Sequence, residues 1–126
     1  NLQNQIQFLG NVSDLPECLG KLQIFVLSTH WEGMPLALVE GMAAGCACVV
    51  SDVIGAREVV TSNVTGLKVP ENDVEAMTAA LLNLLTTPEQ AKNLGESARA
   101  RACSTYGREH MWSTYRSLLL KRSISH

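Results

Sequence analysis

Short apolar runs separated by amphipathic stretches are the feature of this sequence that most restricts its fold. Residues 24–27 (Ile-Phe-Val-Leu) and 47–50 (Ala-Cys-Val-Val) are continuous apolar runs, which are typical of strands buried on both faces of a parallel sheet. Residues 67–69 form a shorter run before Pro70 and suit an edge strand. We therefore expect an α/β fold, a Rossmann-like doubly wound parallel sheet with flanking helices. Its ligand site should lie beyond the carboxyl ends of the strands.

Capping and turn residues delimit the other expected elements. Residues 6–9 (Ile-Gln-Phe-Leu) predict a further short strand, and Asp14 can cap a helix over about 14–21. Pro35 suits the first turn of a helix that ends near Gly45, and Gly55 serves a turn before a short helix at about 56–61. Asp73 can cap a helix with apolar residues at helical spacing. Two more helices are expected over roughly 89–104 and 108–121.

Charge is unevenly distributed along the chain. Residues 1–91 carry three basic and ten acidic groups, whereas residues 92–126 carry seven basic and two acidic groups. A basic end of this kind suits either an anionic membrane surface or an acidic neighbouring domain, or it is an ordinary solvated helix face. Its arginines have no interleaved aromatic residues and match no nucleic-acid-binding motif, so we expect no nucleic-acid partner.

Cysteine use and hydropathy indicate a cytoplasmic protein. Cys18, Cys46, Cys48 and Cys103 lie in apolar surroundings without metal-ligand spacing, so we expect buried free thiols in a reducing compartment. The longest apolar run spans about ten residues, half of what a membrane-spanning helix needs. The sequence opens abruptly at Asn1 with what resembles a core strand. We expect that part of the domain precedes it.

Two glutamates bracket a glycine-containing loop and the first turns of a largely apolar helix. Glu40 is flanked by apolar residues, and burying it without partners would cost several kcal/mol. A ligand diol would supply such partners, because two adjacent ribose hydroxyls match the two oxygens of one carboxylate. The free N–H groups at the helix start and the helix dipole favour an anionic diphosphate. The segment therefore indicates a nucleoside diphosphate site.

The loop residues support the same interpretation. Gly33 permits close approach of the backbone to a ligand, and Pro35 stiffens the turn. Glu32 lies outside the helix and is placed to hydrogen-bond hydroxyls of a sugar beyond the diphosphate. His30 and Trp31 are candidates for a sugar-facing wall, although a loop histidine is more often simply exposed.

This segment carries a resemblance to a known family. Glu32 and Glu40, within Glu-Gly-Met-Pro-Leu-Ala-Leu-Val-Glu-Gly-Met-Ala-Ala-Gly, look like the paired-glutamate motif of the group 1 (family 4) retaining glycosyltransferases. The similarity continues through residues 49–60 and 65–70 and begins with Phe-Leu-Gly-Asn-Val at 8–12. It covers residues 6–120, so the chain resembles the C-terminal nucleotide-sugar-binding domain of an enzyme with the two-domain GT-B fold.

The resemblance implies a role for each motif residue. In the family the first glutamate, here Glu32, faces the donor sugar near the reacting carbon and is the expected catalytic residue. The second, here Glu40, holds the ribose. The remaining donor contacts would come from Gly33, Met34, Pro35 and Leu36 against the diphosphate and sugar, and from Gly10, Asn11 and Val12 near the base.

The resemblance also implies what the whole enzyme does. Residues 1–126 would be the donor-binding domain, incomplete at its N-terminal side. Relatives carry a basic pair on the earlier half of this domain and their acceptor site on an N-terminal domain, and this chain has neither. The full enzyme would transfer a sugar, UDP-linked by default, to an acceptor hydroxyl with retention, without a metal or other cofactor. Its implied setting is polysaccharide or lipopolysaccharide synthesis, in the cytoplasm or peripherally at the inner membrane.

Two alternatives use the same residues differently. A nucleotide-sugar epimerase of the same architecture would share the ribose glutamate, but it should also have catalytic acids and a histidine that this sequence does not offer. A non-catalytic sugar-nucleotide-binding module would keep the donor contacts without transfer. Donor turnover by the intact protein separates the module from the enzyme.

Overall fold

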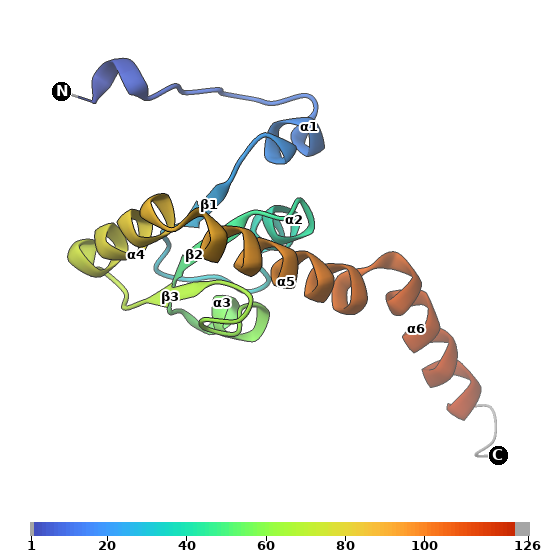
Figure 1. The fold of residues 1–126 in the computed structure, drawn as a ribbon. Coiled ribbons are helices and arrows are strands. Elements are labelled where there is room, and N and C mark those ends of the chain that lie inside the picture. The colour runs from blue at the N-terminus through green and yellow to red at the C-terminus, as the bar shows by residue number, and fades with distance from the viewer. Residues whose placement is uncertain (1, 123–126) are drawn as a thin grey trace.

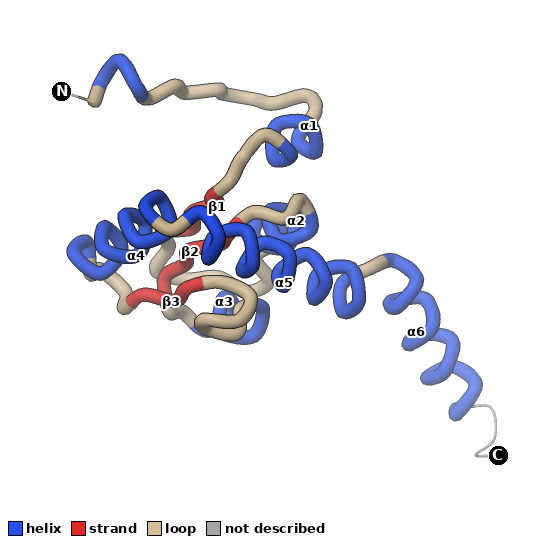
Figure 2. Tube along the Cα trace, in the orientation of Figure 1, coloured by secondary structure: helices blue, strands red, loops and turns tan. Residues whose placement is uncertain are grey.

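A computed structural model describes residues 2–122 of the chain. Three strands and six α-helices alternate along most of this part, after a short 3₁₀ turn at Gln3–Gln5 (Figures 1 and 2). The elements are α1 (Leu15–Gly20), β1 (Ile24–Leu27), α2 (Leu36–Ala43), β2 (Ala47–Ser51), α3 (Ile54–Val59), β3 (Leu67–Val69), α4 (Val74–Thr86), α5 (Pro88–Tyr106) and α6 (Arg108–Arg122).

The strands form one parallel sheet in the order β1-β2-β3. Ile24 pairs with Ala47, and Val49 pairs with Leu67. All five residues of the central strand β2 are buried, as its apolar sequence predicts. Because the three strands are parallel, their carboxyl ends meet at the same edge of the sheet, where the loops that follow them come together.

Helices cover both faces of the sheet, which confirms the predicted layered α/β architecture. On one face, Cys48 and Val50 of β2 belong to a core with α2, α3 and α5. On the other, Ala47 and Val49 pack in a second core with α4 and with Leu94 of α5. In Figure 1, α5 runs beside α2 and across the sheet, and α5 contacts both α2 and β2. The loops at the carboxyl ends of the strands therefore start from a sheet that helices cover on both faces.

Two strand predictions are corrected by the structure. Residues 6–9 form no strand, and Phe8 is 94% exposed. A strand requires a hydrogen-bonded neighbour, and the described residues place none beside this segment. β1 does form, but its residues are only half-buried and Val26 is exposed. β1 lies at an edge of this sheet, which leaves it with less cover than β2.

The helix boundaries follow the capping residues closely. The Asp14 carboxylate accepts a hydrogen bond from the Glu17 N–H at 2.9 Å, and Asp73 accepts one from the Ala76 N–H at 2.8 Å. Gly45 follows α2 with a φ of +86°, the left-handed conformation that glycine tolerates best. α3 begins at Ile54, two residues before the predicted start, so Gly55 lies inside its first turn.

The cysteines are less uniform than expected. Cys46 and Cys48 are buried, Cys18 is half-buried and Cys103 is exposed, so the expectation that all four thiols are buried is wrong. Cys103 lies on the outward side of α5, where Ala98 and Ala102 take the buried positions. Burial, and second the neighbouring Cys46, raise the pKa of the Cys48 thiol to about 12.

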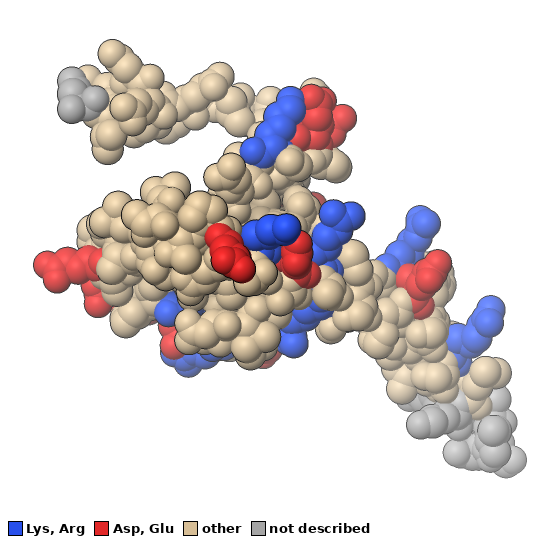
Figure 3. All heavy atoms as spheres, in the orientation of Figure 1, with Lys and Arg blue, Asp and Glu red and all other residues tan. Residues whose placement is uncertain are grey.

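The last helix projects away from the sheet (Figure 1). α6 exposes several large apolar side chains, among them Trp112, Tyr115 and Leu118. Lys and Arg side chains are spread along the helices at this end, as the blue atoms in Figure 3 show. None of the helices within residues 2–122 is long and apolar enough to cross a membrane.

Candidate functional site

The loop between β1 and α2 leaves the carboxyl edge of the sheet and is held at its start by neighbouring segments. The Thr29 N–H donates to the hydroxyl of Ser51, at the end of β2, at 3.2 Å. The Thr29 hydroxyl donates to the carbonyl of Trp31 at 3.1 Å. His30 Nδ1 lies 2.9 Å from a carboxylate oxygen of Glu71, just beyond β3. All three strand ends therefore contribute to the shape of this loop.

The middle of the loop lies against the first turn of α3. A Cβ built on Gly55 would lie 2.3 Å from the carbonyl oxygen of Gly33 and 2.5 Å from that of Glu32. The φ of Gly55 is not in the left-handed range. The close backbone contact, not a turn, is therefore what requires glycine here.

The start of α2 presents backbone donors to solvent. Pro35 is the buried N-cap residue and provides no side-chain cap, while the Leu36 N–H bonds the Met34 carbonyl at 2.9 Å. Within residues 2–122, the N–H groups of Gly33, Met34 and Ala37 have no acceptor, and all three residues are exposed. Such a helix start offers donors and a positive dipole end to an anion.

Glu40 lies one turn further along α2 and is exposed, so folding alone does not bury this carboxylate. The buried residues of α2 are Leu38, Gly41 and Met42, which share one face of the helix. Glu40 lies on the opposite face, because two residues along a helix turn the side chain by about 200°. The Glu40 carboxylate is therefore in contact with water.

A cavity of about 430 Å³ adjoins Glu40, between α1 and α2. Leu15 and Leu19 of α1, Ala43 and Ala44 after Glu40, and Arg99 of α5 contribute to its lining. Its volume is within the range of small-molecule sites. Glu32 does not line this cavity.

Glu32 and the helix start lie on one continuous segment, with Glu32 half-buried. In the part of the chain that the structure describes, neither glutamate side chain has a hydrogen bond or an ion pair with another residue. Two free carboxylates thus flank a row of free backbone donors. This arrangement suits a ligand that carries hydroxyls on both sides of an anionic group.

The structure does not bring the predicted base-binding residues to this site. Gly10, with a φ of +61°, and its neighbours Asn11 and Val12 are exposed, as are all residues from 2 to 17. None of the three lines the cavity beside Glu40. Their role near the base stays a prediction.

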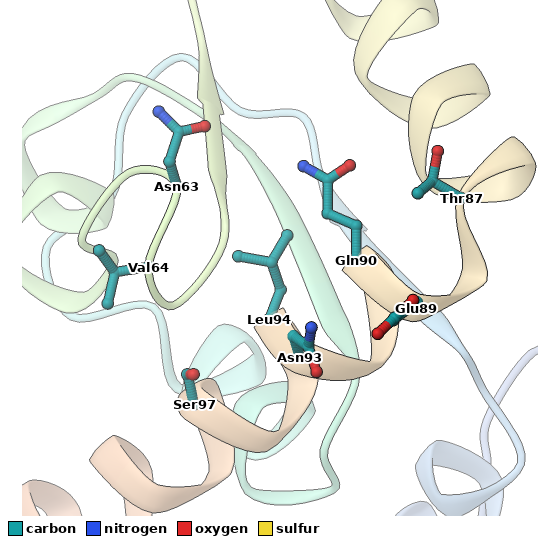
Figure 4. Close-up of a pocket in the computed structure, with 8 residues that line it drawn as sticks. All are labelled: Asn63, Val64, Thr87, Glu89, Gln90, Asn93, Leu94 and Ser97. Atoms are coloured by element: carbon teal, nitrogen blue, oxygen red, sulfur yellow. The ribbon is translucent and has the colours of Figure 1, made fainter.

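Other hollows lie apart from the glutamates. A cavity of about 250 Å³ lies at the carboxyl edge on the α4 side, with Ser28, His30 and Ser51 in its lining. Figure 4 shows one of about 510 Å³ between the turn after α3 and the start of α5. Its labelled lining residues are Asn63, Val64, Thr87, Glu89, Gln90, Asn93, Leu94 and Ser97. None of the predicted site residues is among them.

Residues 2–122 contain no group of three His, Cys, Asp or Glu side chains placed to hold a metal ion. Transfer without a metal or another cofactor stays a prediction from the sequence.

Sequence reasoning missed the residues that hold the loop in place. Ser51, Gly55 and Glu71 contact it from later parts of the chain. Ser51 lies within residues 49–60, which carry the family resemblance, but nothing in that segment indicates a contact with the loop, and Glu71 lies just beyond residues 65–70. The sequence predicts a turn at Gly55, and only its position after a strand and within residues 49–60 of the family resemblance points to the carboxyl edge.

Comparison with known proteins places these features in a family. A family model described as glycosyl transferases group 1 matches residues 1–101. An Escherichia coli UDP-Gal:α-D-GlcNAc-diphosphoundecaprenol α-1,3-galactosyltransferase is 34% identical over 84 residues, which are 67% of this chain and 22% of that protein. A lipopolysaccharide core biosynthesis mannosyltransferase, LpcC of Rhizobium leguminosarum, is 31% identical over 122 residues, 94% of this chain and 35% of that protein.

Solved structures share the fold. A glycosyltransferase from Rickettsia africae superimposes with a TM-score of 0.87 at 26% identity, over 99% of this chain and 34% of its own. Anabaena HepE, solved in complex with UDP, superimposes with a TM-score of 0.81 at 21% identity, over 92% of this chain and 33% of its own. These neighbours have the expected GT-B fold.

The chain spans about a fifth of the length of the Escherichia coli relative and about a third of the length of the Rhizobium relative. The family model, in contrast, covers most of the chain, including the loop and both glutamates. The predicted resemblance is therefore confirmed, and the chain belongs to the group 1 glycosyltransferases.

Proposed function

We propose that this chain is the donor-binding part of an enzyme that transfers a sugar from a nucleoside diphosphate sugar to an acceptor hydroxyl. The observation that carries the proposal is the row of free N–H groups at the start of α2, between the unpartnered carboxylates of Glu32 and Glu40. The diphosphate would lie at Gly33, Met34, Pro35 and Leu36. Glu40 would then accept hydrogen bonds from the ribose, and Glu32 would face the sugar.

This arrangement supports departure of the diphosphate. Negative charge grows on the leaving group as the bond to the anomeric carbon breaks, and preorganised N–H donors stabilise that charge. The α2 dipole adds to this stabilisation. The two glutamates do not act as a glycosidase acid and nucleophile, because one of them is assigned to the ribose, away from the reacting carbon. We further propose that the anomeric configuration is retained, as the family resemblance implies.

A UDP-sugar is the proposed donor. The Escherichia coli relative carries UDP-Gal in its name and acts on a diphosphoundecaprenol-linked sugar, and the Rhizobium relative contributes to the lipopolysaccharide core. We propose a corresponding step in bacterial polysaccharide or lipopolysaccharide assembly. The acceptor would be bound by an N-terminal domain, and a membrane-bound acceptor would bring the enzyme to the inner membrane surface.

Two substitutions in the intact protein test the proposal. Glu40→Ala should weaken UDP binding roughly 10- to 100-fold, because a charged acceptor of ribose hydrogen bonds is lost. Glu32→Ala should lower kcat at least tenfold while changing UDP affinity little. Neither side chain has a partner within the described chain, so both variants should fold.

Calorimetric titration with UDP, GDP and ADP measures the affinity and names the base, and donor turnover gives kcat. Glu75→Ala is the matched control, since Glu75 is an exposed glutamate of α4, remote from the loop. Unchanged affinity in Glu40→Ala would refute the ribose role. Tight nucleotide binding without transfer to any acceptor would instead favour the non-catalytic binding module.

A further inference from the structure

Gly55 stands out among the glycines because it touches the segment that carries Glu32. It is buried in the first turn of α3. An added Cβ would lie 2.3 Å from the Gly33 oxygen, 2.5 Å from the Glu32 oxygen and 2.9 Å from the Glu32 carbonyl carbon. All three are backbone atoms, so no side-chain rotation relieves the contact. An ordinary contact needs at least 3.4 Å, so loop and helix would have to part by about 1 Å.

α3 cannot easily move back to provide that space. Ala56 and Val59, on its inner side, are fully buried in the core with α2 and α5. The Arg101 guanidinium, from α5, donates to the carbonyl of Val59 at 2.9 Å and to that of Glu58 at 3.1 Å. These bonds fix the C-terminal end of the helix.

The loop is the more movable partner, and it is fixed only at its ends. Thr29 is bonded to Ser51 at the start, and Pro35 is buried at the other end. Between them, the middle of the loop rests on α3 at Gly55. A side chain at position 55 would therefore displace the backbone of Glu32 and Gly33.

We propose that Gly55 is a positioning residue, whose missing side chain sets where Glu32 and Gly33 meet the donor sugar. This inference rests on the proposed function, in which Glu32 faces that sugar. A misplacement of about 1 Å can cost about a hundredfold in rate, because catalysis depends on alignment of the reacting groups. Of the groups assigned to the nucleotide, only the Gly33 N–H lies on the displaced backbone, while the N–H groups of Met34 and Ala37 and the Glu40 carboxylate lie further along the chain. Position 55 should therefore affect the rate more than nucleotide affinity.

The test is Gly55→Ala in the intact protein, with kcat, donor KM and UDP Kd measured side by side. We expect kcat to fall at least tenfold, whereas the UDP Kd should rise by a clearly smaller factor, because only one of the proposed diphosphate donors, the Gly33 N–H, is displaced. Gly66→Ala is the matched control. It also forces a Cβ against a backbone oxygen, that of Cys48 at 2.7 Å, but away from the loop. It should lower stability and leave the kcat of the folded protein unchanged.

Arg101→Ala is the second variant, and it tests the support of the loop by α3 if Gly55→Ala does not fold. Without the two bonds to α3, the support behind the loop loosens, and kcat should fall about threefold or more, by a larger factor than the UDP Kd rises. Arg108→Ala, in the first turn of α6, should leave both values unchanged. Equal losses of kcat in Gly55→Ala and Gly66→Ala would overturn the proposal, as would wild-type kcat in Arg101→Ala.

The Glu32→Ala variant separates this proposal from the proposed function. If Glu32→Ala keeps its turnover, the assignment of Glu32 to the sugar fails, whatever Gly55→Ala does. If Glu32→Ala loses turnover and Gly55→Ala keeps it, only the positioning role of Gly55 fails.

Discussion

Asp14 and Asp73 each begin a helix, and their effect is local. Each carboxylate accepts a hydrogen bond from the N–H three residues later, at α1 and α4. The sequence alone predicted both caps, because the partners lie within one turn. Arg101, in contrast, bonds the carbonyls of Val59 and Glu58, which precede it by 42 and 43 positions in the sequence. No pattern in the neighbouring sequence indicates such a contact.

Asp73→Ala should destabilise the protein by about 1 kcal/mol, because α4 loses the acceptor for an otherwise free N–H. Asp73→Asn should keep most of the stability, since its side-chain oxygen still accepts that bond. Urea unfolding of the three proteins measures the difference. If the alanine variant matched wild type, the cap would contribute nothing.

Cys48 links burial to the pH dependence of stability. Its pKa is about 12 in the folded protein, against an ordinary value of 9.0, because burial disfavours the thiolate. The unfolded chain therefore releases this proton first as pH rises. The contribution of the protonated Cys48 thiol to the free energy of unfolding is therefore fully present below pH 9 and is lost between about pH 9 and 12.

Raising the pH from 8 to 10.5 should lower the unfolding free energy of wild type by about 1 to 2 kcal/mol more than that of Cys48→Ala. Urea unfolding at both pH values provides the comparison. Cys103→Ala removes an exposed thiol and should keep the wild-type loss. An equal loss in Cys48→Ala and wild type would show that the thiol does not cause it.

At the scale of elements, periodicity predicted the helices better than the strands. α2, α5 and α6 lie close to their expected ranges, and α4 begins directly after its predicted cap Asp73, because helical hydrogen bonds are made within one segment. A strand depends on its neighbour. Residues 6–9 have the composition of a strand without a partner in the described chain, whereas β2 is enclosed by β1 and β3.

α2 connects the core to the candidate site, because its inner face packs while its start and outer face carry the free donors and Glu40. Leu38→Ala should cost about 2 to 5 kcal/mol, since Leu38 is fully buried and truncation leaves a cavity. Leu82→Ala, at a position 56% exposed, should cost less than about 0.5 kcal/mol. Denaturant unfolding distinguishes the two. Similar costs would mean that α2 is not held by this core.

Across the whole molecule, the parallel sheet gathers three loops at one edge, and the Glu32 loop is supported there by Ser51, Gly55 and Glu71. The fold class and the choice of this loop followed from the sequence, since both depend on alternating patterns and one compact motif. The exposure of Glu40 and the supports of the loop did not, because they depend on how distant elements pack.

The central claim is that the start of α2 binds the diphosphate of the donor. The most direct measurement follows the backbone amide NMR signals of the intact, isotope-labelled protein during titration with UDP. We predict that the amide signals of Gly33, Met34 and Ala37 move with saturation, because these N–H groups gain acceptors. Those of Asn93 and Ser97, which line the cavity in Figure 4, should stay in place. Saturable UDP binding that leaves the α2 amides unchanged would contradict the account.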